Sequence, residues 1–318
     1  MSKPNKKHND KLPDDHILVR YRMVTSLDDV KSLRFWKAVG AEFLGTLLLV
    51  LIGCGSCVTL GKEYTELEGQ QIVVIKDGSE GVVRIALGFG LSVATIVWCV
   101  GHVSGGHINP AVTCAFFITR RISLARALIY ILAQCIGAII GAGVLRGLTP
   151  EEHRHALGAT LLHSSVDGGK GFGVEFFITI VLVLTIFATS DKKRRDLNGS
   201  FPLTIGLAVA MCHLFAVPYT GASMNTARSF GPAVVMGEWE DHWVYWVGPI
   251  LGGIIAGLLY DNVFASNASL SKARGFLLSS DYDSEKFPPQ RNRIKIIEEE
   301  TEELQPDQNK DSNMTSGV

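Results

Sequence analysis

The chain contains one segment twice, in altered form. Residues 104–113 read SGGHINPAVT, and residues 220–229 read TGASMNTARS. The likeness extends upstream, because GLSVA at 90–94 and GLAVA at 206–210 each begin 19 residues before the Asn of their copy. A duplication that lies among long apolar stretches predicts two structural repeats that meet at one central site.

Apolar stretches dominate the sequence, of which 47% is hydrophobic and only 19% charged. A helix needs about 20 apolar residues to cross a bilayer. Stretches of about this length occupy 36–60, 82–103, 124–145, 172–189, 201–217 and 243–264. Two others, 109–118 and 225–235, are too short to cross. They are either surface loops or half-helices that enter the membrane and stop, and their apolar content favours half-helices.

Each copy of the duplication carries three spans and one half-helix. Three is an odd number, so the second copy is inverted in the membrane, and the two half-helices approach from opposite faces and meet near its middle. The predicted fold is an all-α membrane protein with six transmembrane helices and two re-entrant half-helices in two inverted repeats, at about 35–146 and 170–265. This channel domain (35–265) lies between an N-terminal tail (1–34) and a C-terminal tail (266–318), both expected to be loosely ordered.

Basic residues predict the orientation, because Lys and Arg near membrane spans collect on the cytoplasmic side. Three groups fall on one side in the six-span arrangement: Arg20, Arg22, Lys31, Arg34 and Lys37; Arg120, Arg121 and Arg126; and Lys192, Lys193, Arg194 and Arg195. The opposite loops, 62–81 and 147–171, are poorer in basic residues. Both tails are therefore predicted to be cytoplasmic. Residues 1–32 are too polar for a signal peptide, so the first span is expected to act as its own insertion signal.

An Asn begins each half-helix. Asn109 and Asn225 are suited to cap these helices, because an Asn side-chain oxygen accepts from the exposed amides of a first turn. We expect this to leave the amide hydrogens free. Two such caps at mid-membrane place two donors and two positive helix ends at one point, where a water molecule accepts from both and cations are repelled. The alternative is two ordinary helix caps with no pore.

These motifs resemble those of the aquaporins, the major intrinsic protein family, over about residues 35–264, and in particular those of its water-selective animal branch. The resemblance implies the aquaporin fold, in which six tilted helices and two half-helices surround an hourglass pore. It also implies a homotetramer in which each subunit has its own pore. The pore signature of the family falls on Asn109, Pro110, Ala111, Asn225, Thr226 and Ala227.

The selectivity filter of the family is carried over by position onto Phe89, His213, Ala222 and Arg228, with Ala222 contributing its backbone carbonyl. This set resembles the narrow filter of water-specific members, whereas glycerol-conducting relatives have a small residue in place of the His. Each residue has a simpler alternative. His213 and Phe89 are also compatible with ordinary core packing, and Arg228 with a side chain that reaches the membrane interface.

Glu42 and Glu175 occupy matching positions in the two copies, in the stretches EFLGT and EFFIT. Acidic residues inside a membrane are candidates for function by default, and a proton relay is one interpretation. The other, which the family resemblance also implies, is that each carboxylate supports the loop of a half-helix. The absence of further acids, Lys or His beside them favours loop support.

Thr226 departs from the family pattern, which has Pro at this position as at Pro110. Thr loses the preset φ of Pro and restores an N–H at the first helical position. We expect Asn225 to keep its role, with its orientation less rigid. The Thr226 amide can compete with the pore water, or its hydroxyl can cap the turn.

The predicted function is a passive, water-selective channel of the plasma membrane, driven by osmotic gradients and excluding protons and ions. Its partners are water and the lipid bilayer. The alternatives are an aquaglyceroporin-like facilitator of glycerol, urea or ammonia, and an adhesion or scaffold protein with a closed pore. No enzyme activity, cofactor, metal or nucleic acid is expected, and the six cysteines, which all fall in apolar segments, predict no disulfide framework.

Two short motifs suggest regulation. Ser123 follows two Arg residues, as in sites of basophilic kinases, and is a candidate for phosphorylation. The C-terminal residues Ser316, Gly317 and Val318 have the hydroxyl and apolar end that PDZ domains bind by strand addition.

Overall fold

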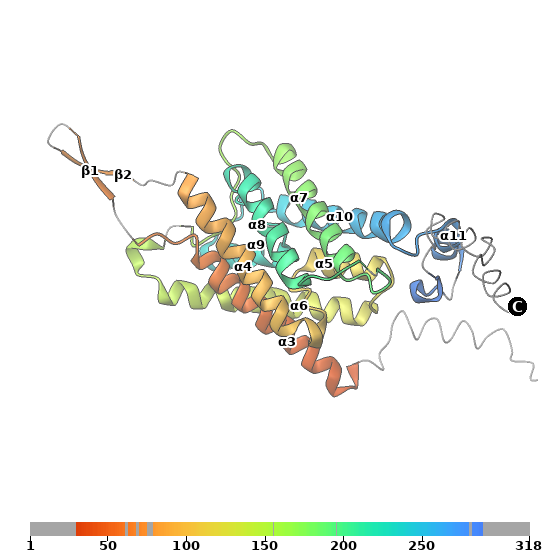
Figure 1. Cartoon of the computed structure of the whole chain (residues 1–318). Coiled ribbons are helices and arrows are strands. Elements are labelled where there is room, and N and C mark those ends of the chain that lie inside the picture. The colour runs from red at the N-terminus through yellow and green to blue at the C-terminus, as the bar shows by residue number, and fades with distance from the viewer. Residues whose placement is uncertain are drawn as a thin grey trace, which may run out of the picture.

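Six long helices and two short ones form the body of the protein. The computed structural model describes residues 30–60, 63–67, 70–74, 79–154, 156–194, 196–279 and 282–288. The long helices are α3 (Leu33–Leu49), α4 (Ser79–Ser104), α6 (Leu124–Leu148), α7 (Gly168–Thr189), α8 (Phe201–Thr220) and α10 (Val244–Leu259) (Figure 1). Both α3 and α10 continue as a π-helical turn, at Val50–Cys54 and Tyr260–Phe264. All six are long and apolar enough to cross a membrane.

The predicted half-helices are both present. They are α5 (Pro110–Ile118) and α9 (Thr226–Met236), and each begins directly after its Asn cap. The first predicted span was too long at its C-terminal end, because the helix stops at Cys54 and the apolar residues up to 60 continue without it. Apolar composition alone does not indicate where helical hydrogen bonding ends.

The helix order places the connections on two opposite faces. The terminal face carries the start of α3, residues 119–123, 190–194 and 196–200, and residues 265–279 after α10. The hairpin face carries residues 55–60, 149–154 and 237–243, together with an antiparallel hairpin of β1 (Glu63–Leu67) and β2 (Gln70–Val74) (Figure 1). This hairpin lies outside the helical body, so it adds to the predicted all-α fold without altering it.

The two repeats exchange their short helices. Half-helix α5 of the first repeat packs mainly on α10 of the second, and α9 of the second packs mainly on α6 of the first. The central contact between repeats is that of α4 with α8. There the backbones nearly touch: a Cβ added at Gly90 would lie 2.7 Å from the carbonyl oxygen of Gly206. This pair of glycines is therefore required by the close approach of the two helices.

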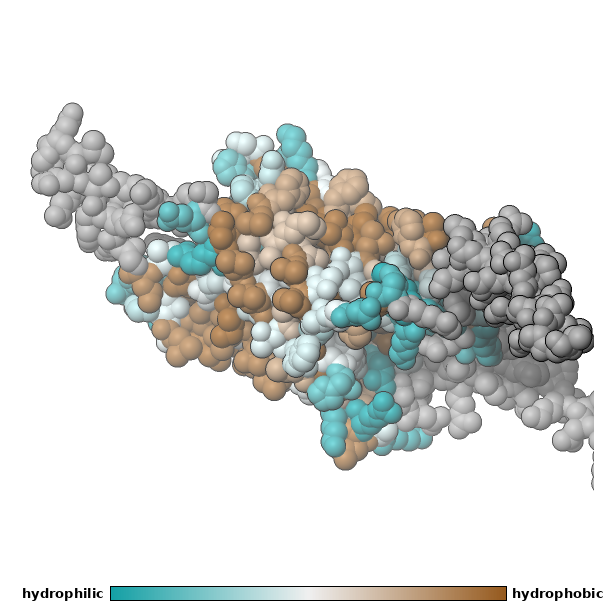
Figure 2. Space-filling view, viewed as in Figure 1, coloured by the Kyte–Doolittle hydropathy of each residue, from teal (hydrophilic) through white to brown (hydrophobic). Residues whose placement is uncertain are grey.

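Large apolar side chains cover the outside of the helices. On α6 they recur every four residues, at Leu128, Leu132, Ile136, Ile140 and Val144, all between 41% and 60% exposed. Figure 2 shows apolar residues over much of the surface between the two ends of the molecule. Such a continuous apolar surface suits lipid or a neighbouring subunit and is not found on water-soluble monomers.

The C-terminal segment is more ordered than expected. Residues Leu270–Leu278 form helix α11, and Ser284–Lys286 form a 3-10 turn, both at the terminal face (Figure 1). The expectation of a loosely ordered tail was wrong here, because polar contacts with residues far away in the sequence hold α11 in place. The N-terminal tail before residue 30 lies outside the described residues.

Candidate functional site

Asn109 and Asn225 cap the two half-helices as predicted. The Oδ1 of Asn109 accepts from the N–H of Ala111 at 2.8 Å. The Oδ1 of Asn225 accepts from the N–H groups of Ala227 and Arg228 at 3.0 and 3.2 Å. Each oxygen therefore satisfies amides at a helix N-terminus that would otherwise lack a partner.

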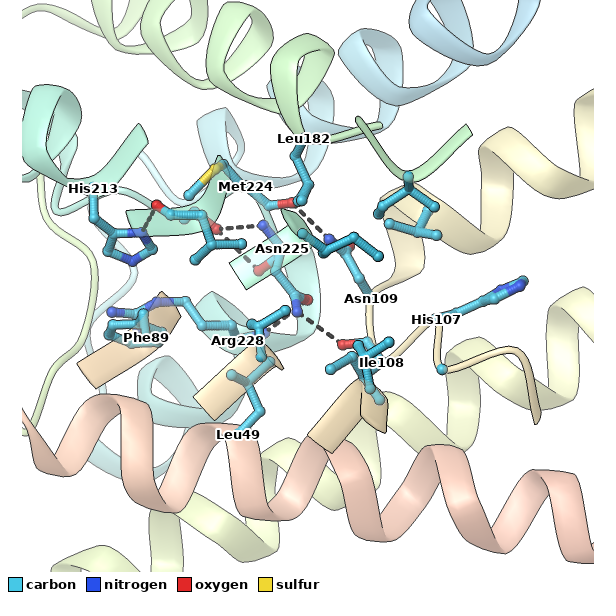
Figure 3. A pocket seen from close by; sticks show the side chains of 18 of the residues that line it. Leu49, Phe89, His107, Ile108, Asn109, Leu182, His213, Met224, Asn225 and Arg228 are labelled. Carbon is cyan, nitrogen blue, oxygen red and sulfur yellow. Dashed lines mark hydrogen bonds between the residues drawn. The ribbon is translucent and has the colours of Figure 1, made fainter. Parts of the chain in front are cut away.

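The two caps are joined across the repeats. The Nδ2 of Asn109 donates to the carbonyl of Met224 at 2.7 Å, and the Nδ2 of Asn225 donates to the carbonyl of Ile108 at 2.8 Å (Figure 3). The expectation that both amide hydrogens of each Asn are free was therefore wrong. Each carboxamide uses one hydrogen to bind the loop of the other repeat, which leaves one N–H per Asn for a molecule in the pore.

The residue before each Asn has a left-handed backbone. The φ angle is 44° at Ile108 and 52° at Met224. This conformation is costly for residues with a side chain, and most of all for a β-branched one such as Ile. It turns each carbonyl toward the opposite Asn and persists because the surrounding contacts over-determine it.

Two buried carboxylates supply these contacts. The Oε1 of Glu42 accepts from the N–H of His107 at 2.9 Å, and its Oε2 from the N–H of Ile108 at 2.5 Å. Glu175 does the same in the second repeat, with the N–H of Ser223 at 2.9 Å and of Met224 at 2.8 Å. Hydrogen bonds to a charged acceptor are about twice as strong as neutral ones.

Side chains complete the environment of both carboxylates. Ser104 and Thr220 each donate a hydroxyl at 2.6 Å, and Gln134 donates its Nε2 to Glu42 at 2.8 Å. Both Glu residues are fully buried. This geometry agrees with the loop-support interpretation. Each of these hydrogen bonds joins a carboxylate to a re-entrant loop or to one of its neighbours.

Asn109 and Asn225 line a narrow pocket. Its volume is about 60 Å³, which admits a few water molecules at about 10–15 Å³ each. Figure 3 shows Phe89, His213 and Arg228 toward one end, Asn109 and Asn225 in the middle, and His107 toward the other end. The sites predicted from the two copies therefore lie along one path.

Three of the four predicted filter residues form one cluster. The rings of Phe89 and His213 are stacked, with centroids 4.6 Å apart. The guanidinium of Arg228 lies over the same Phe89 ring, 4.4 Å from its centroid. The Nδ1–H of His213 donates to the carbonyl of Val209 at 2.9 Å, whereas its Nε2 is buried with no partner in the described part of the chain. An unpartnered nitrogen beside the pocket is available to a passing water.

Arg228 is held by two residues that the sequence did not suggest. Its Nη1 donates to the carbonyl of Gly158 at 2.5 Å and to the Sγ of Cys54 at 3.3 Å. Neither Cys54 nor Gly158 is among the site residues predicted from the sequence. No local pattern identifies them, because both contacts join segments that are distant in the sequence.

The fourth filter residue, Ala222, is fully buried and has a φ of 53°, and it does not line the pocket. Thr226 is also fully buried, and its Oγ1 has no hydrogen-bond partner among the residues the structure describes. The hydroxyl therefore does not cap the turn, which Asn225 caps alone.

The remaining predicted residues lie away from this centre. Ser123 caps α6, where its hydroxyl accepts from the N–H of Arg126 at 3.2 Å, and it is only 9% exposed. A kinase needs an accessible hydroxyl, so phosphorylation there requires the start of α6 to open. All six cysteines are free. The motif Ser316, Gly317 and Val318 lies outside the described residues.

Comparison with known proteins agrees with this architecture. Residues 29–260 match the family described as Major intrinsic protein. Aquaporin-4 of Mus musculus is 50% identical over 257 residues, which is 81% of this chain and 76% of that protein. Aquaporin-1 of Sus scrofa is 46% identical over 241 residues, or 76% of this chain and 87% of that protein.

Among solved structures, the aquaglyceroporin from Plasmodium falciparum superposes with a TM-score of 0.61 over 72% of this chain and 97% of its own, at 23% identity. At that identity the likeness concerns the fold alone. The family match covers most of the chain, and the relatives share about half of its residues over that length. The protein therefore belongs to the major intrinsic protein family.

Proposed function

We propose that the protein is a passive, water-selective channel driven by osmotic gradients. The observation that carries this proposal is the pair of carboxamides, Asn109 and Asn225, each bonded to the opposite loop and each left with one N–H beside a narrow pocket. The relatives named aquaporin-4 and aquaporin-1 support it. The major intrinsic proteins are channels, and membership of that family supports a channel rather than an enzyme.

Proton and ion exclusion follows from the electrostatics of this centre. Helices α5 and α9 both begin at the Asn pair, so the positive ends of their dipoles face the pocket. A water that accepts from both carboxamides has its own hydrogens turned outward, which interrupts a continuous chain of hydrogen bonds. The buried guanidinium of Arg228 adds a full positive charge at the pocket, and cations are repelled.

Glycerol conduction is the alternative that needs separate testing. We propose that the stack of Phe89 on His213, with Arg228 over the same ring, leaves too little width for a carbon skeleton. The experiment is stopped-flow light scattering on vesicles that contain the purified protein, under water and glycerol gradients. We expect fast swelling with water and slow glycerol entry. Glycerol entry at the rate of water overturns water selectivity, and no increase over empty vesicles in either arm supports a closed scaffold.

Basic residues bear on the orientation of the protein in the membrane, and exposed apolar surfaces bear on its assembly. The described members of the basic groups, such as Lys31, Arg121 and Lys193, lie on the terminal face. We propose that this face is cytoplasmic and that the membrane is the plasma membrane. The apolar stripe on α6 and the similar surfaces of other helices support a homotetramer, which chemical cross-linking in native membranes tests. A PDZ domain at Ser316, Gly317 and Val318 remains a proposal from the sequence pattern.

A further inference from the structure

A second, larger cavity opens at the terminal face. Its volume is about 490 Å³, within the roughly 300–1,000 Å³ typical of sites for small molecules. Gly105 and His107 line both this cavity and the narrow central pocket. The two spaces therefore lie in series, and a molecule that leaves the pocket at this end passes through the cavity.

The C-terminal segment forms one wall of this cavity, through Lys272, Tyr282, Asp283 and Ser284. The segment is fixed by Lys272, which is 1% exposed. Its Nζ donates to the carbonyl of Asp261 at 2.7 Å and to the Oδ1 of Asn267 at 2.8 Å. The Nδ2 of Asn267 in turn donates to the carbonyl of Ser284 at 2.8 Å. These hydrogen bonds hold the C-terminal segment in place, so the wall is part of the folded structure.

Arg120, which also lines the cavity, binds the same segment. Its Nη1 donates to the carbonyl of Ser279 at 3.1 Å, and its guanidinium lies over the rings of Phe276 and Tyr282, 5.2 and 5.7 Å from their centroids. Arg120 thus joins the end of α5 to the segment after α11.

The charged lining of the cavity is mainly basic. Five basic side chains line it, against three acidic ones: Arg120, Arg121, Lys192, Lys193 and Lys272, and Asp191, Asp261 and Asp283. Asp191 and Asp261 are held by contacts within the protein. Asp191 accepts from the N–H of Ser266 at 3.0 Å, and Asp261 pairs through its Oδ1 with Arg121 at 2.6 Å. The lining therefore has a formal excess of positive charge, which favours an anion.

Three buried polar atoms of this lining have no hydrogen-bond partner in the part of the chain that is described. They are the Nε of Arg121, the hydroxyl of Tyr282 and the Oδ2 of Asp261. Burial raises the pKa of Tyr282 to about 12, so its hydroxyl is protonated at neutral pH. Buried polar groups normally have partners, and two donors without an acceptor suit a ligand rich in acceptor oxygens. The Oδ2 of Asp261 suits a P–OH group or a bound water.

We infer that this cavity is a binding site for a phosphate-bearing anion, held between Arg120, Arg121 and the C-terminal segment. Because the cavity lies in series with the central pocket, a bound anion lies across the water path and slows permeation. The effect on permeation rests on the water-channel function proposed above, whereas the binding does not.

Binding is tested by calorimetric titration of the purified full-length chain with inorganic pyrophosphate and, separately, with inositol 1,4,5-trisphosphate. Lys192→Gln removes one charge from an exposed side chain of the lining and carries little risk of misfolding. Lys170→Gln is the matched control, since Lys170 is an exposed residue that lies beside Asp167 on the hairpin face. We expect saturable binding that Lys192→Gln weakens about threefold to tenfold and Lys170→Gln leaves unchanged. Tyr282→Phe, which removes only the unpartnered hydroxyl, is expected to weaken it also.

A lipid headgroup and a free phosphate ester present the same chemistry, and a second arm separates them. The protein is placed in vesicles of phosphatidylcholine with soluble inositol trisphosphate, or in vesicles that contain phosphatidylinositol 4,5-bisphosphate. Swelling that slows only in the first arm identifies a free anion, and swelling that slows only in the second identifies a lipid. Absence of saturable binding, or equal weakening by both Lys variants, overturns the site. Binding with unchanged swelling overturns its place across the water path, whereas absence of swelling without any anion counts against the channel function alone.

Discussion

Phe89 is the residue that organises the filter cluster, because it contacts both of its polar members. His213 stacks on its ring, and Arg228 lies over it. The family resemblance, carried over by position, predicted that these three side chains form one filter. It was not sufficient to find Cys54 and Gly158, whose contacts with Arg228 connect different loops. Contacts of this kind leave no periodic signal in the sequence.

Removal of the imidazole at position 213 is expected to widen the filter. In His213→Gly, the ring stacked on Phe89 is lost and a glycerol molecule gains room. We expect glycerol uptake into vesicles to rise at least about tenfold, which corresponds to a barrier lower by about 1.4 kcal/mol, while water uptake persists. Cys212→Ala is the control, because Cys212 is equally buried on the same helix but does not line the pocket. Unchanged glycerol uptake in His213→Gly contradicts the assigned role.

Replacement of Thr226 by Pro is expected to stabilise the protein. The fully buried hydroxyl of Thr226 lacks a partner among the described residues, and such a group costs about 1–3 kcal/mol. Proline also presets the φ of the first helical position, as it does after Asn109. We expect Thr226→Pro to raise the thermal midpoint in detergent by a few degrees without a loss of water permeability.

A second variant at this position separates the two effects. Thr226→Val removes only the hydroxyl, at nearly constant volume. A rise in the midpoint with Val equal to that with Pro assigns the whole gain to the unsatisfied hydroxyl. A fall in the midpoint with both variants shows that the Thr226 hydroxyl makes a stabilising hydrogen bond, and contradicts the prediction.

The re-entrant loops are the elements that determine the site, and each depends on one carboxylate. Glu42 and Glu175 hold equivalent N–H groups, so the two loops are related by the repeat in their hydrogen bonding as well as in their sequence. The sequence located both acids and both half-helices. It did not indicate the left-handed backbone at Ile108 and Met224, because such a conformation is imposed by the surrounding contacts and not by residue preference.

Neutralisation of one carboxylate is expected to release its loop. In Glu175→Gln, the amide nitrogen faces an N–H or hydroxyl donor, so at least one hydrogen bond becomes a repulsion between donors. Hydrogen bonds to charged groups contribute about 1.5–3 kcal/mol each. We expect a lower thermal midpoint in detergent and loss of most water permeability, with Glu42→Gln behaving alike. Normal stability with a changed pH dependence of permeation would instead favour the proton-relay interpretation.

We expect that no side chain is tolerated at Gly90, where α4 and α8 cross. A Cβ at Gly90 would lie 2.7 Å from the carbonyl oxygen of Gly206 and 2.8 Å from the Cβ of Ala210, so Gly90→Ala must push the helices apart. Overpacking of this kind costs about 1–3 kcal/mol. Gly143→Ala on α6 is the matched control, since nothing lies within 4 Å of its added Cβ. We expect Gly90→Ala, but not Gly143→Ala, to lower the thermal midpoint, measured by size-exclusion chromatography after heating.

At the scale of the whole molecule, inversion of the repeats is what brings the half-helices together. It also places the described basic residues Lys31, Arg121 and Lys193 on one face, and experiment can test which side of the membrane that face occupies. His163→Asn creates an Asn-Ser-Ser glycosylation acceptor at an exposed position of the hairpin face. We expect this variant to gain a glycan when expressed in animal cells, seen as a gel shift that a glycosidase reverses.

The native chain provides the control for orientation. It already has an acceptor at Asn198, Gly199 and Ser200, which lies on the terminal face, and this acceptor is expected to stay unmodified. A glycan on the native chain at Asn198, with none in His163→Asn, would place the terminal face outside the cell.

The number and order of the spans, the inverted repeats and the two Asn caps could all be predicted from the amino-acid sequence. Lipid offers no hydrogen bonds to the backbone, so each span must satisfy its own and is therefore encoded locally by its apolar length. Three features could be found only in the folded structure. They are the carbonyl that each carboxamide binds, the groups that hold Arg228, and the place of α11 beside the cavity at the terminal face. These contacts join residues far apart in the chain, as in the pair Asn225 and Ile108, and they exist only once packing has brought the two repeats together.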